Sequence, residues 1–345
     1  MSTMDSREIS GRPVGLQGEN LIYLISQPRA GSTLLQRILA TSHDIHTLSE
    51  PYLMLHPLYA LRSSGYTAEY YEKLAREATV AFLDSIPGGE AAYVDGIRRM
   101  YSHLYGLALE QSGKRYFLDK TPPYYFIIPE LAGIFPDARY IILLRNPLAV
   151  LSSIMMKWLD RDWLRIRDFG SALLRAPRLL LDGIDHVGSR CLVVHYEKLV
   201  EDPETQVSRM CAWLNIGYCP AMVDYGHANL PRWTLGDSSE IYLHHRPMGQ
   251  NATKWIQSLE HPQFWRYSHD YLHALGKPVV EQMGYSFDGL NQVLEEHRPS
   301  NLRLWRTVPL SLAVEETSGV KRSVRNIWIS GARRLTVAAS STSYR

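Results

Sequence analysis

The 345-residue chain carries 37 lysine and arginine residues against 35 aspartate and glutamate residues, which gives a formal net charge of +2. This balance argues against the broad basic surface of a nucleic-acid-binding protein, while a local basic cleft for an anionic ligand stays compatible with it. Hydrophobic residues make up 45% of the chain, enough to build one large α/β domain or two smaller ones.

The cysteines and the N-terminus favour a soluble protein of a reducing compartment. Cys191, Cys211 and Cys219 are odd in number and lack CxxC spacing, so they indicate neither a disulfide framework nor a zinc site. Residues 1–20 are polar without an apolar signal core, and no run approaches the roughly 18 apolar residues of a membrane span. We therefore predict a flexible N-terminus over residues 1–20, no transmembrane segment and a cytoplasmic location.

Residues 21–39 predict a buried strand, a tight loop and the start of a helix. The apolar run Leu21–Ile25 has no helical spacing, as expected of a parallel strand covered on both faces. Gly31 allows the backbone to approach a ligand, and Ser32 or Thr33 can cap the following helix. Such a helix start directs backbone N–H groups and a positive dipole end at one point, which favours a bound phosphate. The residues expected to line this anion site are Arg29, Ala30, Gly31, Ser32, Thr33 and Leu34.

The loop differs from the P-loop of nucleoside triphosphatases, which reads GxxxxGK[ST] and uses its lysine to reach the terminal phosphates. No lysine stands between Gly31 and Ser32, and Ser26 takes the place of the first glycine. The strong cation, Arg29, comes earlier in the loop. These departures disfavour ATP or GTP hydrolysis and keep the phosphate site. The alternative is a plain strand-to-helix turn without a ligand.

Beyond the loop, strand and helix patterns alternate, which predicts an α/β fold with a central parallel sheet flanked by helices. Short apolar runs indicate strands over residues 45–48, 116–118, 139–144 and 191–194. Apolar residues at helical spacing indicate helices over residues 68–83, 101–111 and 125–134, the first of them ending before Pro87–Gly89. Further helices are expected after Pro147 and Pro203, where proline suits the first turn, and within residues 158–188.

Polar residues follow several of these strands, at the edge where ligands bind in open α/β sheets. Glu50 comes after the strand over 45–48, and Lys120 stands in the sequence Asp-Lys-Thr-Pro after the strand over 116–118. Arg145 directly follows residues 139–144, and Ser153 lies about two helical turns further on. The guanidinium of an arginine offers several N–H donors to phosphate oxygens in a fixed geometry, and a serine hydroxyl can donate one more hydrogen bond. The alternative is a surface ion pair for the arginine and a helix-surface position for the serine.

The loop Pro28-Arg29-Ala30-Gly31-Ser32-Thr33, together with Arg145 and Ser153 at their spacing of eight residues, resembles the sulfotransferase superfamily. The resemblance covers about residues 21–283. It implies a P-loop-like three-layer fold and a loop that binds the 5′ end of 3′-phosphoadenosine 5′-phosphosulfate (PAPS). It also implies that Arg145 and Ser153 hold the 3′-phosphate of PAPS.

Two further cofactor contacts follow from the resemblance. Tyr196, in the sequence His-Tyr-Glu-Lys-Leu, matches a tyrosine near the bound adenosine; the alternative is a strand-end tyrosine packed against the next helix. Arg246, upstream of Lys254-Trp255, matches part of a basic loop that closes over the 3′-phosphate. The complete Arg-Lys-Gly motif of that loop is absent from this chain.

The resemblance implies sulfuryl transfer from PAPS to an acceptor hydroxyl without a metal ion. Arg29 would stabilise the oxygen that joins phosphate to sulfate, and Lys120 would be a second cation. Pro122 stands where cytosolic small-molecule enzymes have their catalytic histidine. The chain therefore looks more like the carbohydrate and tyrosylprotein sulfotransferases, bacterial members included, in which a glutamate after the second strand is the general base. Glu50 fits that role; the alternative is a structural ion pair.

Two other functions stay open at this point: a P-loop kinase for a small molecule, and a nucleotide-binding module without turnover. The missing lysine and the lack of a Walker-B-like aspartate disfavour the kinase. The acceptor class is open among small-molecule, carbohydrate, lipid and peptide hydroxyls, as is the oligomeric state, a homo-oligomer included. We expect no nucleic-acid partner, a sulfotransferase domain over residues 21–298 and a basic C-terminal tail over residues 299–345.

Overall fold

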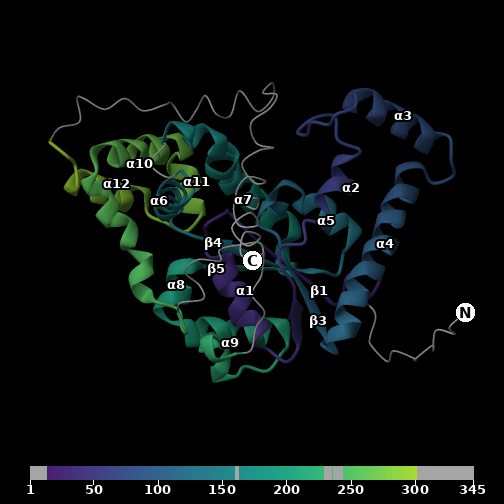
Figure 1. Ribbon diagram of the computed structural model, residues 1–345, viewed down its shortest axis with the longest axis horizontal. Coiled ribbons are helices and arrows are strands. Elements are labelled where there is room, and N and C mark those ends of the chain that lie inside the picture. The colour runs from purple at the N-terminus through teal and green to yellow at the C-terminus, as the bar shows by residue number, and fades with distance from the viewer. Residues whose placement is uncertain (1–13, 160–162, 229–234, 236–243, 301–345) are drawn as a thin grey trace, which may run out of the picture.

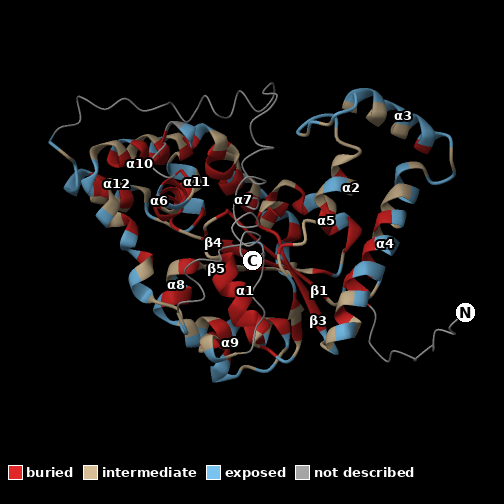
Figure 2. Cartoon of the chain, in the orientation of Figure 1, coloured by how far each residue is buried: buried red, intermediate tan, exposed pale blue. Residues whose placement is uncertain are grey.

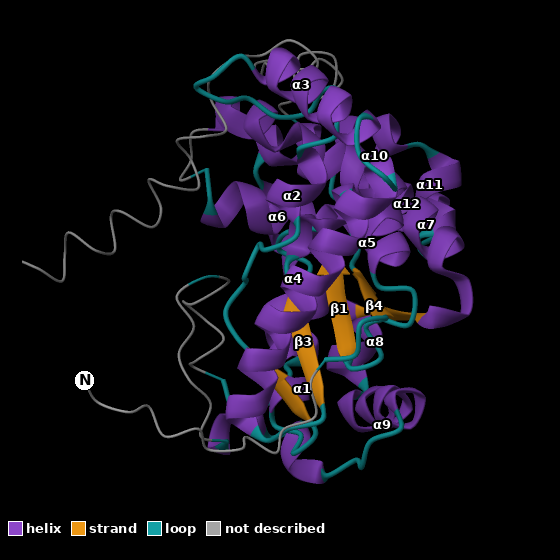
Figure 3. Ribbon diagram, turned by 90° about the vertical axis from the view of Figure 1, so that its right-hand side faces the viewer, coloured by secondary structure: helices purple, strands orange, loops and turns teal. Residues whose placement is uncertain are grey.

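The computed structural model describes residues 14–159, 163–228, 235 and 244–300. Within these residues the centre is a five-stranded sheet in the order β2-β3-β1-β4-β5, in which all neighbouring strands are parallel (Figure 1). Helices lie on both sides of the sheet, as Figure 3 shows from the side, and the predicted three-layer α/β fold is confirmed. The strands are β1 (Leu21–Ser26), β2 (Ile45–Thr47), β3 (Tyr116–Lys120), β4 (Arg139–Leu144) and β5 (Cys191–His195).

The central strands send alternate side chains into two hydrophobic cores. In β1, Ile22 and Leu24 enter one core, while Tyr23 and Ile25 enter the other, and all four are fully buried. Figure 2 shows this burial along β1 and β3 and on the neighbouring helix α1 (Ser32–Ala40). A parallel strand covered on both faces must be apolar at nearly every position, which explains the continuous run in the sequence.

Each core is closed by its own set of helices. The first core packs against α1 and against α6 (Pro147–Lys157), α8 (Tyr196–Glu201), α9 (Pro203–Leu214), α10 (Pro262–Leu275), α11 (Lys277–Gln282) and α12 (Phe287–Glu296). The second packs against α2 (Leu55–Tyr59), α4 (Gly89–Ser112), α5 (Ile128–Ile134) and α7 (Ala176–Val187). Helix α3 (Glu72–Asp84) packs on α4 and lies away from the sheet in Figure 1.

The carboxyl ends of the strands meet at one edge of the sheet. Leu24 of β1 pairs with Lys120 of β3, and Ser26 at the end of β1 pairs with Leu143 of β4. The loops that follow β1, β3 and β4 therefore emerge side by side. This edge carries the residues that the sequence singled out as polar strand ends.

Three predicted helices differ from those observed. Helix α4 begins at Gly89 rather than near residue 101, because Gly88 takes a left-handed conformation (φ 87°) that starts a new helix directly after the turn. Residues 125–134 divide into a 3-10 turn, Pro122–Phe126, and α5. Within residues 158–188, a 3-10 segment and a π-helical turn come before α7.

Part of the predicted flexible N-terminus is packed. Val14 is buried, and the Gln17 carbonyl accepts a hydrogen bond of 2.9 Å from the Asp137 amide. Residues 1–13 and most of the predicted basic tail, residues 301–345, lie outside the described residues. In the part of the chain that the structure describes, none of the helices has the length and apolar character needed to cross a membrane.

Candidate active site

The loop after β1 turns sharply with the help of two left-handed residues. Arg29 has φ 67° and Gly31 has φ 98°. Helix α1 starts at Ser32 with Gly31 as its N-cap and without a side-chain capping bond, so the predicted cap by Ser32 or Thr33 is wrong. The first-turn N–H groups of α1 have no partner within the helix, as the geometry of any helix start requires. They are the donors that an anion at this loop would use.

Gly31 is required for steric reasons as well. A Cβ atom at this position would lie 2.5 Å from Cδ2 of Tyr196, the first residue of α8. Tyr196 is buried and stacks beneath the Arg145 guanidinium, whose carbon lies 4.2 Å from the ring centroid. The absence of a side chain at residue 31 thus lets three predicted site residues from three segments pack together.

Arg145 is fixed by backbone carbonyls. Its guanidinium donates to the Arg29 carbonyl at 2.8 Å and to the Asn251 carbonyl at 3.4 Å. Its Nε is buried and has no hydrogen-bond partner among the described residues. An orphaned buried donor is costly unless a ligand satisfies it.

Ser153 and Arg29 join the two cofactor motifs of the sequence. Arg29 Nε donates to Ser153 Oγ at 3.0 Å, although the residues are 124 positions apart. The Arg29 guanidinium also lies over the ring of Trp158, 5.5 Å from its centroid. The predicted proximity of the β1 loop and the β4–α6 segment is therefore seen in the structure.

Glu50 and Lys120 form a buried ion pair beside the phosphate loop. Lys120 Nζ lies 2.5 Å from Glu50 Oε1 and 3.4 Å from Thr33 Oγ1. The lysine side chain is fully buried, and that of Glu50 is 6% exposed. Because burying two charges is costly even when they are paired, the pair is poorly explained by stability alone. Such pairs are frequent in active sites.

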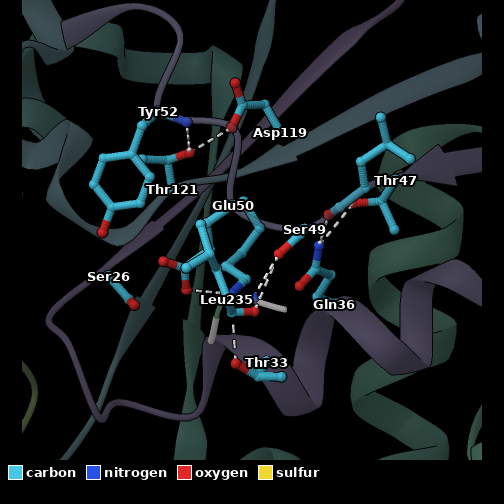
Figure 4. A network of polar contacts seen from close by, with 12 residues as sticks. Ser26, Thr33, Gln36, Thr47, Ser49, Glu50, Tyr52, Asp119, Thr121 and Leu235 are labelled. Atoms are coloured by element: carbon cyan, nitrogen blue, oxygen red, sulfur yellow. Dashed lines mark hydrogen bonds and ion pairs between the residues drawn. The ribbon is translucent and has the colours of Figure 1, made fainter. Parts of the chain in front are cut away.

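The segment before Glu50 is tied to the rest of the site by side chains on both sides. Gln36 of α1 donates to Thr47 Oγ1 at 2.8 Å and to the Leu48 carbonyl at 2.6 Å. Ser49 Oγ accepts from the Leu235 amide at 2.9 Å (Figure 4). These contacts could not be predicted from the sequence, because Gln36 lies inside a helix that was recognised by its apolar positions.

Asp119, next to Lys120, is a buried carboxylate surrounded by hydroxyl groups. It accepts hydrogen bonds from Tyr105 of α4 at 2.6 Å, from Thr121 at 2.7 Å and from Tyr124 at 3.1 Å. Burial raises the pKa of Asp119 to about 6, and the three hydroxyl groups oppose that shift. Asp119 was not among the site residues predicted from the sequence, although its place at a strand end beside Lys120 was a usable signal.

We expect the stability of the chain to fall as Asp119 ionises. Its pKa is about 6 in the fold against 3.8 for an exposed aspartate, so the folded chain binds more protons between these values. The contribution of the protonated form is then complete below about pH 4 and lost as the pH rises through 6. The Tm of the wild type, measured relative to that of Asp119→Asn, should fall between about pH 4.5 and 7.5, by the equivalent of roughly 2 kcal/mol. A constant difference would contradict this assignment.

Arg246, unlike the other predicted site residues, forms an exposed ion pair. Its guanidinium pairs with the Glu204 carboxylate on α9, and both side chains are more than half exposed. The neighbouring segment approaches the site through its backbone, since the carbonyl of Asn251 accepts from Arg145. Among the described residues no group of three or more histidine, cysteine, aspartate and glutamate side chains is arranged to hold a metal ion.

Comparison with known proteins gives a consistent result. The model of a family described as the sulfotransferase family matches residues 22–220. Nodulation protein NoeE of Sinorhizobium fredii is 29% identical over 235 residues, which cover 63% of this chain and 53% of that protein. Protein-tyrosine sulfotransferase 1 of Danio rerio is 24% identical over 208 residues, 59% of this chain and 56% of the relative. The chain thus spans about half the length of these two relatives.

Among solved structures, the sulfotransferase domain from the curacin biosynthetic pathway has a similar fold, with a TM-score of 0.51 and 19% sequence identity. The similarity covers 80% of this chain and 99% of that domain. At this level of identity the match supports the arrangement of the sheet and helices, and the site must be argued from its own residues.

Proposed function

The chain belongs to the sulfotransferase family, and we propose that it transfers a sulfuryl group from PAPS to an acceptor hydroxyl, with Glu50 as the general base. One observation carries the proposal. The buried Glu50–Lys120 pair contacts Thr33 of the phosphate loop, at the same sheet edge where Arg29 and Arg145 lie. The base Glu50, the three cations Lys120, Arg29 and Arg145, and the N-terminus of α1 thus lie where an anionic donor and a hydroxyl would meet.

The residues present fit the two phosphate ends of PAPS. The N–H groups at the start of α1 and the Arg29 side chain suit the 5′ end, as do the small residues Ala30 and Gly31. The orphaned Nε of Arg145 suits a 3′-phosphate, with Ser153 nearby through its bond to Arg29. Tyr196 lies against both Gly31 and Arg145, a suitable place for contact with the nucleoside. We propose that Arg246 closes over the nucleotide in a second state of the protein, in which its ion pair with Glu204 is broken.

The chemistry requires charge neutralisation and a proton acceptor. In the reaction the acceptor oxygen forms a bond to sulfur while the bond from sulfur to the 5′-phosphate oxygen breaks. Glu50 takes the proton of the acceptor hydroxyl, and Arg29 and Lys120 stabilise the negative charge that develops on the leaving phosphate. These protein cations meet the charge requirement, so we propose that the reaction proceeds without a metal ion.

The acceptor side is less defined than the donor side. One relative is named as a nodulation protein and the other as a protein-tyrosine sulfotransferase. We propose that the acceptor is a hydroxyl of a carbohydrate or a peptide, ahead of a lipid or other small molecule. We further propose a sulfotransferase unit over residues 21–298 that acts in the cytoplasm. A screen of acceptor hydroxyls with labelled PAPS identifies the class.

We expect the chain to bind adenosine 3′,5′-bisphosphate without added metal and more tightly than adenosine 5′-phosphate. A lost charge-assisted phosphate contact costs about 1.5–3 kcal/mol, so Arg145→Ala should weaken bisphosphate binding roughly tenfold to a hundredfold and remove the preference. Isothermal titration with both nucleotides, and with ATP with and without Mg²⁺, measures this. Equal affinities in the wild type, or tight binding of ATP with Mg²⁺ alone, would contradict the PAPS assignment.

A further inference from the structure

We propose that Asp119 is a positioning residue for the general base: through the hydroxyl groups of Thr121 and Tyr124 it fixes the turn Pro51–Met54 and thereby Glu50. The inference rests on the proposed role of Glu50 in the reaction. It adds a residue that contacts neither donor nor acceptor and acts only through the backbone that follows the base.

Two short relays connect the carboxylate to the turn. The Tyr52 amide donates to Thr121 Oγ1 at 3.4 Å, and that hydroxyl donates to Asp119 Oδ1 at 2.7 Å (Figure 4). The Met54 amide donates to the Tyr124 hydroxyl at 3.0 Å, which donates to Asp119 Oδ2 at 3.1 Å. Each hydroxyl donates its one proton to the carboxylate and accepts from the amide with a lone pair. A carboxylate, which only accepts, enforces this direction for both relays.

The turn needs such support because it is strained. Tyr52 has φ 56°, a left-handed conformation that a bulky non-glycine residue adopts only when its surroundings impose it. The Tyr52 ring lies beside the Glu50 carboxylate in Figure 4. Burial and the nearby negative charge of Glu50 raise the pKa of the Tyr52 hydroxyl. If the turn relaxed, Tyr52 would leave its place beside Glu50, and the carboxylate would lose a wall of its site.

Other groups around Asp119 have different roles. Tyr105 donates to the same Oδ2 atom from α4, and among the described residues none of the hydrogen bonds found joins its side chain to the turn. Lys120 leaves the chain on the opposite side of β3 and pairs with Glu50. Tyr23 of β1 packs edge-on against the Tyr124 ring, with centroids 5.9 Å apart. The hydroxyl of Tyr105 thus offers a control that perturbs the carboxylate and leaves both relays in place.

The test compares three single variants and one double variant in single-turnover transfer from PAPS. Thr121→Val keeps the shape of the side chain and removes one relay, and Asp119→Asn reverses the direction of at least one hydrogen bond. Both should lower the rate about tenfold to a hundredfold, the loss expected of a small misplacement of a catalytic group. The Kd for adenosine 3′,5′-bisphosphate should stay unchanged. Tyr105→Phe should lower the Tm and keep the rate, and the double variant Asp119→Asn/Thr121→Val should be no slower than the slower single variant.

Hydrogen exchange provides a readout independent of turnover. The amides of Tyr52 and Met54 should exchange faster in Asp119→Asn than in the wild type, and at the wild-type rate in Tyr105→Phe. If Tyr105→Phe slows transfer as much as Thr121→Val does, or if exchange at the two amides is the same in all variants, Asp119 serves only the core and the inference is wrong. A wild type that fails to transfer sulfate from PAPS would overturn the proposed function, while the exchange result would still decide the role of Asp119 in holding the turn.

Discussion

Glu50→Gln should lower the rate of sulfuryl transfer by about 10²–10⁴, the usual contribution of a positioned general base. The amide keeps the shape of the side chain, and its oxygen can still accept from Lys120 Nζ, which lies 2.5 Å from the carboxylate. The loss should therefore appear in kcat, while the affinity for adenosine 3′,5′-bisphosphate stays near that of the wild type. Single-turnover transfer from PAPS at saturating acceptor measures the effect.

The matched control is Glu130→Gln. Glu130 of α5 pairs with Arg62, and its side chain is about one-third exposed, so the change removes a paired carboxylate away from the phosphate loop. Its transfer rate should equal that of the wild type. Retention of more than about a tenth of the wild-type rate by Glu50→Gln would remove Glu50 from the mechanism.

Local chemistry made much of the fold predictable. A parallel strand buried on both faces leaves an unbroken apolar run, and residues 21–25 and 139–144 were recognised in this way. Proline at the first turn marked the starts of α6 and α9, and Asp202 caps α9 as its sequence suggests, accepting from the Thr205 amide. The start of α4 was missed because its first turns are largely exposed and lack a clear apolar stripe.

The candidate site was predictable where motifs at strand ends resemble those of the sulfotransferase superfamily. Arg29, Arg145 and Lys120 were selected on that resemblance, since a strand-end arginine taken by itself is explained equally well by a surface ion pair. The contacts that hold the site residues in place could not be predicted, because they depend on backbone conformation and on residues distant in the sequence. Tyr52 is left-handed without being a glycine, so its sequence carries no sign of the turn. The contact between Gln36 and the Leu48 carbonyl likewise requires the fold to be known.

The role of Glu50 also depends on Lys120, because the two side chains form one buried ion pair. Lys120→Met removes the cation and leaves a carboxylate without its partner, at a position where the lysine side chain is fully buried. Breaking one side of a buried pair costs about 3–5 kcal/mol. We therefore expect a large fall in Tm together with loss of sulfuryl transfer. Lys114→Met is the control, since the Lys114 ammonium donates to the backbone carbonyls of Ala40, Ser42 and Ile45, away from the site.

The double variant Lys120→Met/Glu50→Gln separates the two effects. With both charges removed, the site no longer contains a buried carboxylate without a partner. The Tm of the double variant should therefore be close to that of the wild type and well above that of Lys120→Met. Transfer from PAPS should stay absent, because both the base and a cation for the leaving phosphate are missing. If Lys120→Met instead keeps the wild-type Tm, water must reach Glu50 and the site is more open than its 6% exposure indicates. If the double variant recovers transfer, the pair stabilises the fold and the chemistry belongs to other residues of the site.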